Sequence, residues 1–444
     1  MLSRVSPQRR FKVLYADLAA LAAYTVLLIL RAPQIWRGRF WAEEGSIFFA
    51  SAYSGGLLES LFRPHLGYYA AVTSFATTLA ARSVSLEHAP LVTIGIAALL
   101  QLLPAVLIVT GRIDALPDPL ARALALALLL VAVPSEEIWL TTTSSAHYLA
   151  VSAGILLISN PWASRTRFAC LALLVLAGLS GIGATLLAPF FWWRAHRERS
   201  RERLEQAIAL SVCAAIQAAI VLAAPGLGLA SAGLEAARTP RLDLQVLAHA
   251  ILAKDILLPF AGRAWTEQTM APLAKTLAAQ PTLLPTSAIA IAWAGAIAFV
   301  AVKCRRWQAG LLVCLSLFVV FVSFTASVEA SKPDWQLTHT SALGAGRYYY
   351  LPNFFLGLAL LMAAWTGSAL HKRLRQTALV LVAWLLVVGA NEFFSSDARY
   401  LFFSGPVWKI QVAAWHRGDT RDLAIWPAPW KISLDAAPRA REVR

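Results

Sequence analysis

Two adjacent carboxylates are the side chains in this sequence best suited to do chemistry. Glu43 and Glu44 lie in the stretch FWAEEG (40–45), which follows the first long apolar run of the chain. One carboxylate of such a pair can take a proton from a hydroxyl group while its neighbour orients an acceptor or binds a hard cation. The alternative interpretation is a solvated acidic turn that caps the next helix.

An arginine followed by tyrosines is the second candidate. Arg347 and Tyr348 belong to the stretch GRYYY (346–350), which opens a late apolar run. The planar guanidinium of an arginine can hold a phosphate group through two parallel hydrogen bonds. The alternative is an aromatic belt at the lipid headgroups with one arginine that extends to the membrane surface.

A third polar stretch runs from Glu136 and Glu137 to His147 and includes the hydroxyl side chains of 141–145. These hydroxyls can line a cavity, but residues of this type more often cap a helix, and we favour capping. His65 lies near the acidic loop, where it can bind a phosphate or, alternatively, mark a helix entrance at the membrane surface.

The composition predicts that helices in a membrane position these side chains. Of the 444 residues, 58% are hydrophobic and 14% are charged, whereas soluble domains have about 45–50% apolar and 25% charged residues. A soluble globular protein is therefore excluded. Because a bilayer core needs roughly 20 apolar residues per helix, we expect an all-α polytopic membrane protein with about eleven transmembrane helices. The expected segments are 13–30, 66–81, 90–110, 119–133, 146–159, 168–193, 205–224, 284–302, 309–328, 348–369 and 377–390.

The basic residues predict the orientation of these helices. The formal net charge is +15, and the Lys and Arg residues cluster in short stretches between apolar runs, as in cytoplasmic loops. No nucleic-acid-binding motif accompanies them, so we expect a lipid bilayer as partner and no nucleic acid. The N-terminus is expected in the cytoplasm and the C-terminus on the outer face. The clusters are 4–12, 194–203, 303–306 and 372–375.

This topology divides the chain into a transmembrane domain, 1–390, and an outward-facing tail, 391–444. The outer loops are expected at 31–65, 226–283 and 329–347, and residues 242–260 are expected to form a helix in the membrane interface. The tail has four tryptophans among charged residues, which indicates a segment that acts as a lid or binds the interface. They are Trp408, Trp415, Trp426 and Trp430.

The side of the loop 134–147 stays open, because it contains no Lys or Arg. Simple counting of crossings places it in the cytoplasm. It faces outward instead if 66–81 dips without crossing and 168–193 breaks at its glycines into two short helices. The four cysteines lie in or beside apolar runs and offer neither a disulfide framework nor a CxxC metal site.

The order of these motifs resembles the GT-C superfamily of integral-membrane glycosyltransferases. The resemblance covers the first 70 residues: a first helix, an outer loop with WAEEG (41–45), an interfacial helix, and RPHLGY (63–68) at the start of the next helix. It is closest to bacterial members whose motif reads WAEDG, so Glu44 stands where Asp is commoner. The carboxylate is kept and its reach is longer, which leaves the division of roles between Glu43 and Glu44 open.

The resemblance implies a transfer of sugar from a polyprenyl-phosphate-linked donor to a glycan or lipid acceptor, with inversion, at the outer face of the bacterial inner membrane. Glu43 and Glu44 would be catalytic, with Glu44 favoured as the base, and a divalent cation is the one cofactor for which this chemistry leaves room. Arg347 would hold the lipid phosphate. The other residues expected to bind substrate are Tyr348, His65, Tyr68, Glu137 and His147.

Two other kinds of function use similar features. A transporter or flippase of lipid-linked saccharides would also have many helices and an arginine at a helix mouth, but it would not explain the long loop after the first helix. An O-antigen polymerase or ligase would place its arginines in a late outer loop, where Arg263 and Arg347 are the candidates. The absence of GxxxxGKS, HExxH and GxSxG motifs removes support for ATP-driven transport, zinc proteolysis and serine hydrolysis.

Overall fold

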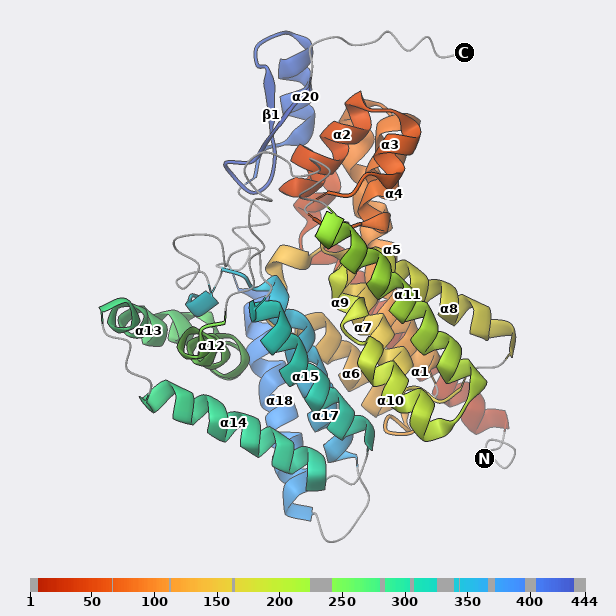
Figure 1. Cartoon of the computed structure of the whole chain (residues 1–444), viewed down its shortest axis with the longest axis vertical. Helices are drawn as coiled ribbons and strands as arrows, with labels where there is room; N and C mark the ends of the chain where they lie inside the picture. Colours follow the sequence, from red (N-terminus) through yellow and green to blue (C-terminus); the bar gives the residue numbers. More distant parts are fainter. Residues whose placement is uncertain are drawn as a thin grey trace.

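The chain is predominantly helical, with one short β-hairpin near its C-terminus (Figure 1). The computed structural model describes residues 7–65, 67–111, 113–161, 164–223, 242–279, 284–303, 307–325, 339–342, 344–365, 372–395 and 405–434. The N-terminal half contains α1 (Pro7–Leu30), η2 (Pro33–Arg37), η3 (Glu44–Phe49), α2 (Ala50–Ser54), α3 (Leu57–Phe62), α4 (Ala71–Ser83), η4 (Leu86–His88), α5 (Ala89–Thr110), α6 (Pro119–Val131), η5 (Glu136–Ile138), α7 (Ser145–Ile158), α8 (Ser164–Leu179), α9 (Ile182–Thr185), α10 (Ala188–Glu198) and α11 (Arg201–Ala223). The C-terminal half contains α12 (Leu244–Ile251), η6 (Leu252–Leu257), α13 (Leu258–Ala279), α14 (Leu284–Lys303), α15 (Trp307–Thr325), α17 (Arg347–Ala364), α18 (Lys372–Phe394), α20 (Trp408–His416), β1 (Asp422–Ala424) and β2 (Lys431–Ser433).

Helix length and composition identify a multi-pass membrane protein. Within the described ranges, six helices are long and apolar enough to cross a membrane, and the number rises to seven if the bent pair formed by α8 with α9 and α10 counts as one span. The expected number of about eleven is not confirmed. The six are Phe11–Leu30, Leu86–Thr110, Arg201–Ala223, Leu244–Leu273, Trp307–Thr325 and Lys372–Phe394.

Two of the expected crossings take a different form. The segment 66–81 contains α4, whose 13 residues are too few for a bilayer core that needs about 20. The segment 168–193 is no straight helix, because its two parts are bent by 118° at the break between Leu179 and Ile182. A segment 66–81 that does not cross the membrane and a broken segment 168–193 are the two conditions under which the loop 134–147 lies on the same side of the membrane as the first loop.

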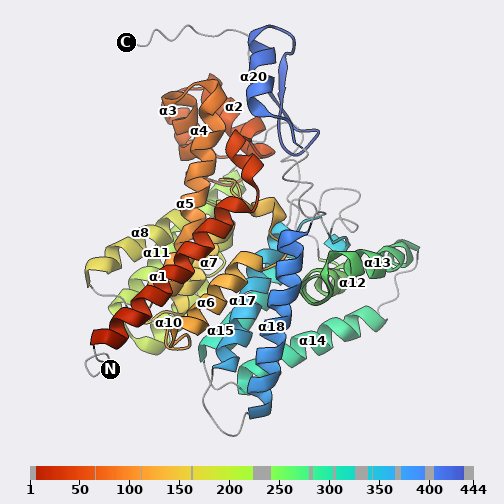
Figure 2. The same cartoon turned by 180° about the vertical axis from the view of Figure 1, so that it is seen from behind.

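The ends of the helices lie at two opposite ends of the bundle (Figures 1 and 2). The beginning of α1, the junction of α10 with α11 and the beginning of α18 lie at one end of the bundle, the lower end in Figure 1. The short helices of the first loop and the C-terminal hairpin lie at the opposite end. The expected basic clusters at 194–203 and 372–375 therefore share the end at which the chain begins.

Two helices form the centre of the bundle. Every residue of α7 from Tyr148 to Ile158 is buried, and so is every residue of α17 from Tyr349 to Ala364. A helix that is apolar on all sides is stable only when other helices surround it. Both helices begin with polar residues that the sequence singled out, so the core of the bundle positions His147 and Arg347.

The stretch 242–260, expected as a helix in the membrane interface, forms α12, η6 and the start of α13, and it is also part of the candidate span Leu244–Leu273. α12, η6 and α13 follow one another without interruption, and Figure 1 shows α12 and α13 roughly perpendicular to α15 and α17. The chain bends at Gly262, where φ is 80°. Most of the expected outer loop 329–347 lies outside the described residues.

Candidate functional site

Glu44 connects the first loop to the segment before α7. It is the first residue of η3, which has π-helical geometry, and its side chain is 1% exposed. Its Oε1 accepts hydrogen bonds from the backbone N–H of Thr142 at 2.7 Å and from the Thr142 hydroxyl at 2.5 Å, and Oε2 accepts one from the N–H of Trp41 at 3.3 Å. The segment that contains Glu136 and Glu137 therefore lies on the same side as the first loop.

The surroundings of Glu44 affect its ionisation in opposite directions. Burial raises the pKa of the carboxyl, whereas the hydrogen bonds from Thr142 and the charge of Arg39 lower it, and the net direction is upward. Burial likewise lowers the pKa of the Arg39 guanidinium to about 9. Glu44 is thus a buried carboxyl whose pKa is raised in a closed environment.

Glu43 has a different environment. It directly precedes η3 and is only half-buried. In the described part of the chain, its carboxylate accepts no hydrogen bond. Of the two adjacent carboxylates, Glu43 is the one that a substrate hydroxyl can approach without a rearrangement of the loop.

Four of the expected substrate-binding residues gather where α7 and α17 begin. Arg347 Nη1 lies 3.6 Å from Glu137 Oε2, and its guanidinium carbon lies 5.1 Å from the centre of the Tyr348 ring. The half-buried His147 is close enough to Arg347 for an electrostatic interaction with its positive charge. A cation, a carboxylate, an imidazole and a phenol therefore share one region, and Arg347 is partly exposed there.

His65 and Tyr68 lie at the other side of η3. Their backbone groups exchange two hydrogen bonds, each 3.2 Å long. The buried His65 ring packs 4.8 Å from the ring of Phe48, which is in η3 one helical turn after Glu44. Tyr68 lies beside the break after α8, where a Cβ on Gly181 would lie 3.9 Å from its ring.

Thr142 is a functional candidate that the sequence analysis placed in a capping role. Its hydroxyl and N–H instead bind the carboxylate of Glu44. No spacing rule connects two residues that are 98 positions apart, so the only available signal was the density of hydroxyl groups in 141–145.

A network of buried charges supports the beginning of η5, and it was not predicted from the sequence. Arg263 Nη2 donates a hydrogen bond to Glu136 Oε1 at 2.6 Å, and the backbone N–H of Arg263 donates to Glu392 Oε1 at 2.9 Å. Arg31 donates to Ser135 at 2.8 Å, and its guanidinium lies 4.3 Å from the ring centre of Trp139. Buried ionic groups in a membrane protein are paired in this way because isolated charges are costly.

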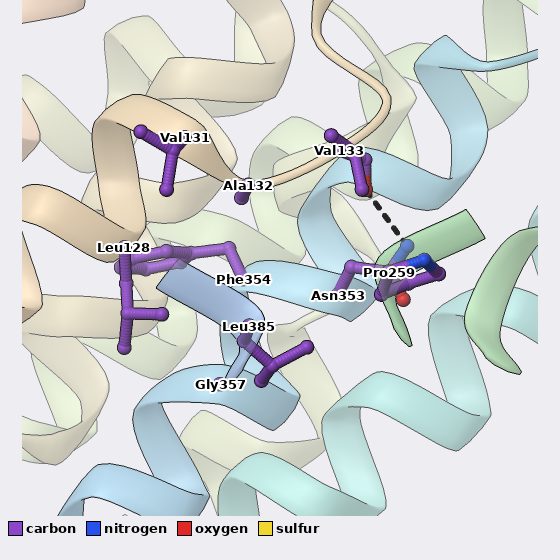
Figure 3. A pocket seen from close by; sticks show the side chains of 9 residues that line it. All are labelled: Leu128, Val131, Ala132, Val133, Pro259, Asn353, Phe354, Gly357 and Leu385. Atoms are coloured by element: carbon purple, nitrogen blue, oxygen red, sulfur yellow. Dashed lines mark hydrogen bonds between the residues drawn. The ribbon is translucent and has the colours of Figure 1, made fainter. Parts of the chain in front are cut away.

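A small pocket lies between α6, α13, α17 and α18 (Figure 3). Its volume of about 20 Å³ is enough for one water molecule. Asn353, whose side-chain amide donates to the carbonyl of Val133 at 2.8 Å, is its polar lining residue. The pocket contains none of the expected site residues and is too small for a sugar.

In the described ranges, no three His, Cys, Asp or Glu side chains come together in a way that suits a metal ion. Comparison with known protein families, with curated proteins and with solved structures found no match for the chain.

Proposed function

We propose that the protein is a GT-C-like glycosyltransferase that moves a sugar from a polyprenyl-phosphate donor to a glycan or lipid acceptor at the outer face of the bacterial inner membrane. In this proposal the chain crosses the membrane about eleven times, with shorter and bent helices completing the spans. The first loop, with its short helices α2 and α3, and the C-terminal segment both face outward.

The observation that carries the proposal is the continuous connection between the two chemically distinct groups. The segment 136–144 binds Glu44 at one end through Thr142, and at the other end Glu137 pairs with Arg347. Glu43, which directly precedes Glu44 and is suited to accept a proton, and Arg347, which is suited to bind a phosphate, therefore lie on segments that the same stretch connects. A sugar transfer from a lipid phosphate requires both groups.

The environment of the two glutamates supports a specific division of roles. Glu43, half-buried, is the general base, and Glu44 holds the loop through Thr142. As the acceptor oxygen attacks the anomeric carbon, its proton passes to Glu43. The bond from that carbon to the phosphate oxygen breaks with inversion, and Arg347 stabilises the charge that develops on the leaving phosphate. This division reverses the roles favoured from the motif alone.

The decisive experiment is a transfer assay with the purified full-length chain in lipid nanodiscs. A donor labelled in the polyprenyl chain is supplied with candidate glycan and lipid acceptors, and release of polyprenyl phosphate is measured. We expect release that depends on the acceptor and is lost in Glu43→Gln. Movement of an intact donor across proteoliposomes, with no cleavage under any condition, would instead indicate the transporter alternative.

A further inference from the structure

The C-terminal segment folds against the first loop. Residues 405–434, here called the C-terminal cap, contain α20 and the β1–β2 hairpin. The backbone N–H of Trp426 donates to the carbonyl of Phe40 at 3.2 Å, and the N–H of Ala42 donates to the carbonyl of Trp426 at 2.5 Å. Trp41 and Trp426 thereby form a parallel β-bridge immediately before Glu43.

Side chains reinforce this pairing. The indole N–H of Trp408 donates to the carbonyl of Leu86 at 2.8 Å, and the Trp408 ring meets Phe40 edge-on at 5.1 Å. A Cβ on Gly45 would lie 2.7 Å from Cδ1 of Ile425, which is in the C-terminal cap. The same Cβ would lie 2.8 Å from the Cβ of Phe40, so a side chain at Gly45 would force the cap or the loop to shift.

The cap contacts the loop where its backbone is strained. Ala42 has φ of 40°, in the left-handed region that side chains other than glycine disfavour. Its N–H is held by Trp426, and its carbonyl accepts from Gly45 at 3.2 Å. Such strain persists only where the surrounding structure enforces it, and it is common at functional sites.

A charged side chain joins the same contact. The guanidinium of Arg39 lies between two indoles, 4.7 Å from the ring centre of Trp41 and 5.4 Å from that of Trp426. Arg39 is 1% exposed, and its positive charge acts on Glu44. The cap thus contacts both the backbone before the carboxylate pair and the cation that balances Glu44.

We propose that Trp426 is a positioning residue for Glu43 and Glu44. Its backbone holds Ala42 in the left-handed conformation, and its indole packs against the guanidinium of Arg39 in the first loop. The two carboxylates then leave the turn in fixed directions, Glu44 toward Thr142 and Glu43 toward the open side. The catalytic consequence rests on the proposed function, whereas the coupling of the cap to the loop does not.

The coupling is tested by hydrogen–deuterium exchange on the full-length protein in nanodiscs, without any substrate. Trp426→Ala keeps the backbone groups of residue 426 but removes the indole that packs against Arg39 and donates to the carbonyl of Pro406, so the strand that pairs with the loop loses its anchor. We expect peptides covering 40–46 to exchange about five- to tenfold faster, the change expected when one or two backbone hydrogen bonds open more often. Trp430→Ala is the matched control. It removes a second indole from the same hairpin, and within the described residues that indole, unlike that of Trp426, packs against no guanidinium of the first loop. Equal exchange of 40–46 in the two variants would overturn the proposal.

The catalytic consequence is tested in the transfer assay. Trp426→Ala is expected to lower kcat at least about tenfold with little change in the KM of the donor, because it misplaces the base without removing a donor contact. Ala42→Gly in the same chain should recover most of the loss, since glycine adopts positive φ without strain. A fall in kcat that Ala42→Gly does not recover contradicts a positioning role. If wild type shows no transfer but exchange follows the pattern above, the proposed function fails and the coupling stands.

Discussion

Glu43 and Glu44 are adjacent in the chain, but their environments allow different chemistry. Glu44 faces three hydrogen-bond donors in a closed contact, whereas Glu43 is half-buried at the edge of η3. The proton of an acceptor hydroxyl can reach Glu43 directly. In the proposed reaction, Glu43 therefore has the catalytic role and Glu44 the supporting one.

The first prediction separates these roles. Glu43→Gln is expected to lower turnover by about 10²- to 10⁴-fold, because a general base is lost, and to leave stability unchanged. Glu44→Gln is expected to destabilise the protein by about 1–3 kcal/mol, because an amide NH₂ group would face the donors of Thr142 or Trp41. Transfer rates and thermal unfolding check both, with the exposed Glu59→Gln as control. Full activity of the Glu43→Gln, Glu44→Gln double variant would remove this loop from the mechanism.

A second prediction follows from the ionisation of Glu44. Because its pKa in the folded protein is raised above the ordinary value of 4.5, the native state binds this proton more tightly than the unfolded chain does. The contribution to stability is therefore complete below pH 4.5 and is lost as the pH rises through the folded pKa. Unfolding measured from pH 4 to pH 7 should show this decline in wild type. The decline should be smaller in Glu44→Gln, and an identical pH dependence of the two proteins would contradict it.

A third prediction concerns the donor phosphate. Arg347→Ala should weaken donor binding by about 1.5–3 kcal/mol, the range for a hydrogen bond to a charged group. Arg347→Lys should recover only part of the affinity, since a lysine offers a point charge in place of a planar fork. Equilibrium binding of the lipid donor checks both, with Arg63→Ala, which removes an exposed arginine of the first loop, as control. Unchanged affinity in Arg347→Ala would favour the aromatic-belt interpretation.

Among the elements, the break between α8 and α9 lies directly against the beginning of α7. Gly181 has φ of 148° there, and a Cβ on it would lie 2.9 Å from the Cβ of Ala146 in the first turn of α7. The break thus allows the chain to turn back directly against the helix that begins beside Glu44 and Arg347. Gly183, two residues later, is in α9, and a Cβ there would have an ordinary contact of 3.6 Å with Ala150.

The fourth prediction uses this pair of glycines. Gly181→Ala should destabilise the protein by about 1–3 kcal/mol, the cost of a non-glycine residue in a disfavoured backbone region, and should displace the beginning of α7. Gly183→Ala should have little effect. Thermal unfolding and hydrogen exchange of 141–147 check the difference. Similar stability of the two variants would show that the break tolerates a side chain.

The elements also show how far the sequence could be interpreted. Apolar runs correctly predicted a multi-pass helical protein. The glycines in 168–193 left a straight helix and a broken one as alternatives, and the structure has the broken one. Contacts between distant segments were not predictable, because neither the pairing of Thr142 with Glu44 nor that of Arg263 with Glu136 leaves a periodic signal. The tail was expected to be a lid or an interface segment, and two of its tryptophans, Trp408 and Trp426, contact the first loop. Sequence alone did not indicate this contact.

At the scale of the whole molecule, pairs of buried charges join helices that are far apart in the sequence. Arg122 forms two hydrogen bonds of 2.9 Å with Asp17, which joins α6 to α1. At the end where the chain begins, Arg194 and Arg203 are buried and both donate to the carbonyl of Ser159, just after α7. Cations at this position favourably oppose the dipole of α7. Two arginines of the basic cluster at 194–203 therefore also stabilise the central helix.

The last prediction is the orientation of the molecule. The beginning of α1 and the junction of α10 with α11 lie at one end of the bundle, and the C-terminal cap lies at the other (Figure 1). Because basic residues are retained in the cytoplasm, we expect a cysteine at position 420 to react with a membrane-impermeant maleimide in intact spheroplasts, and one at position 200 to react only after lysis. The native cysteines are replaced first, and the cysteine-free protein is the control. Labelling of position 200 in intact spheroplasts, with protection of position 420, would show that the orientation is the reverse of the one expected. Glu43 and Arg347 would then face the cytoplasm and could not contact a donor in the outer leaflet. That result would contradict the proposed reaction as well as the topology.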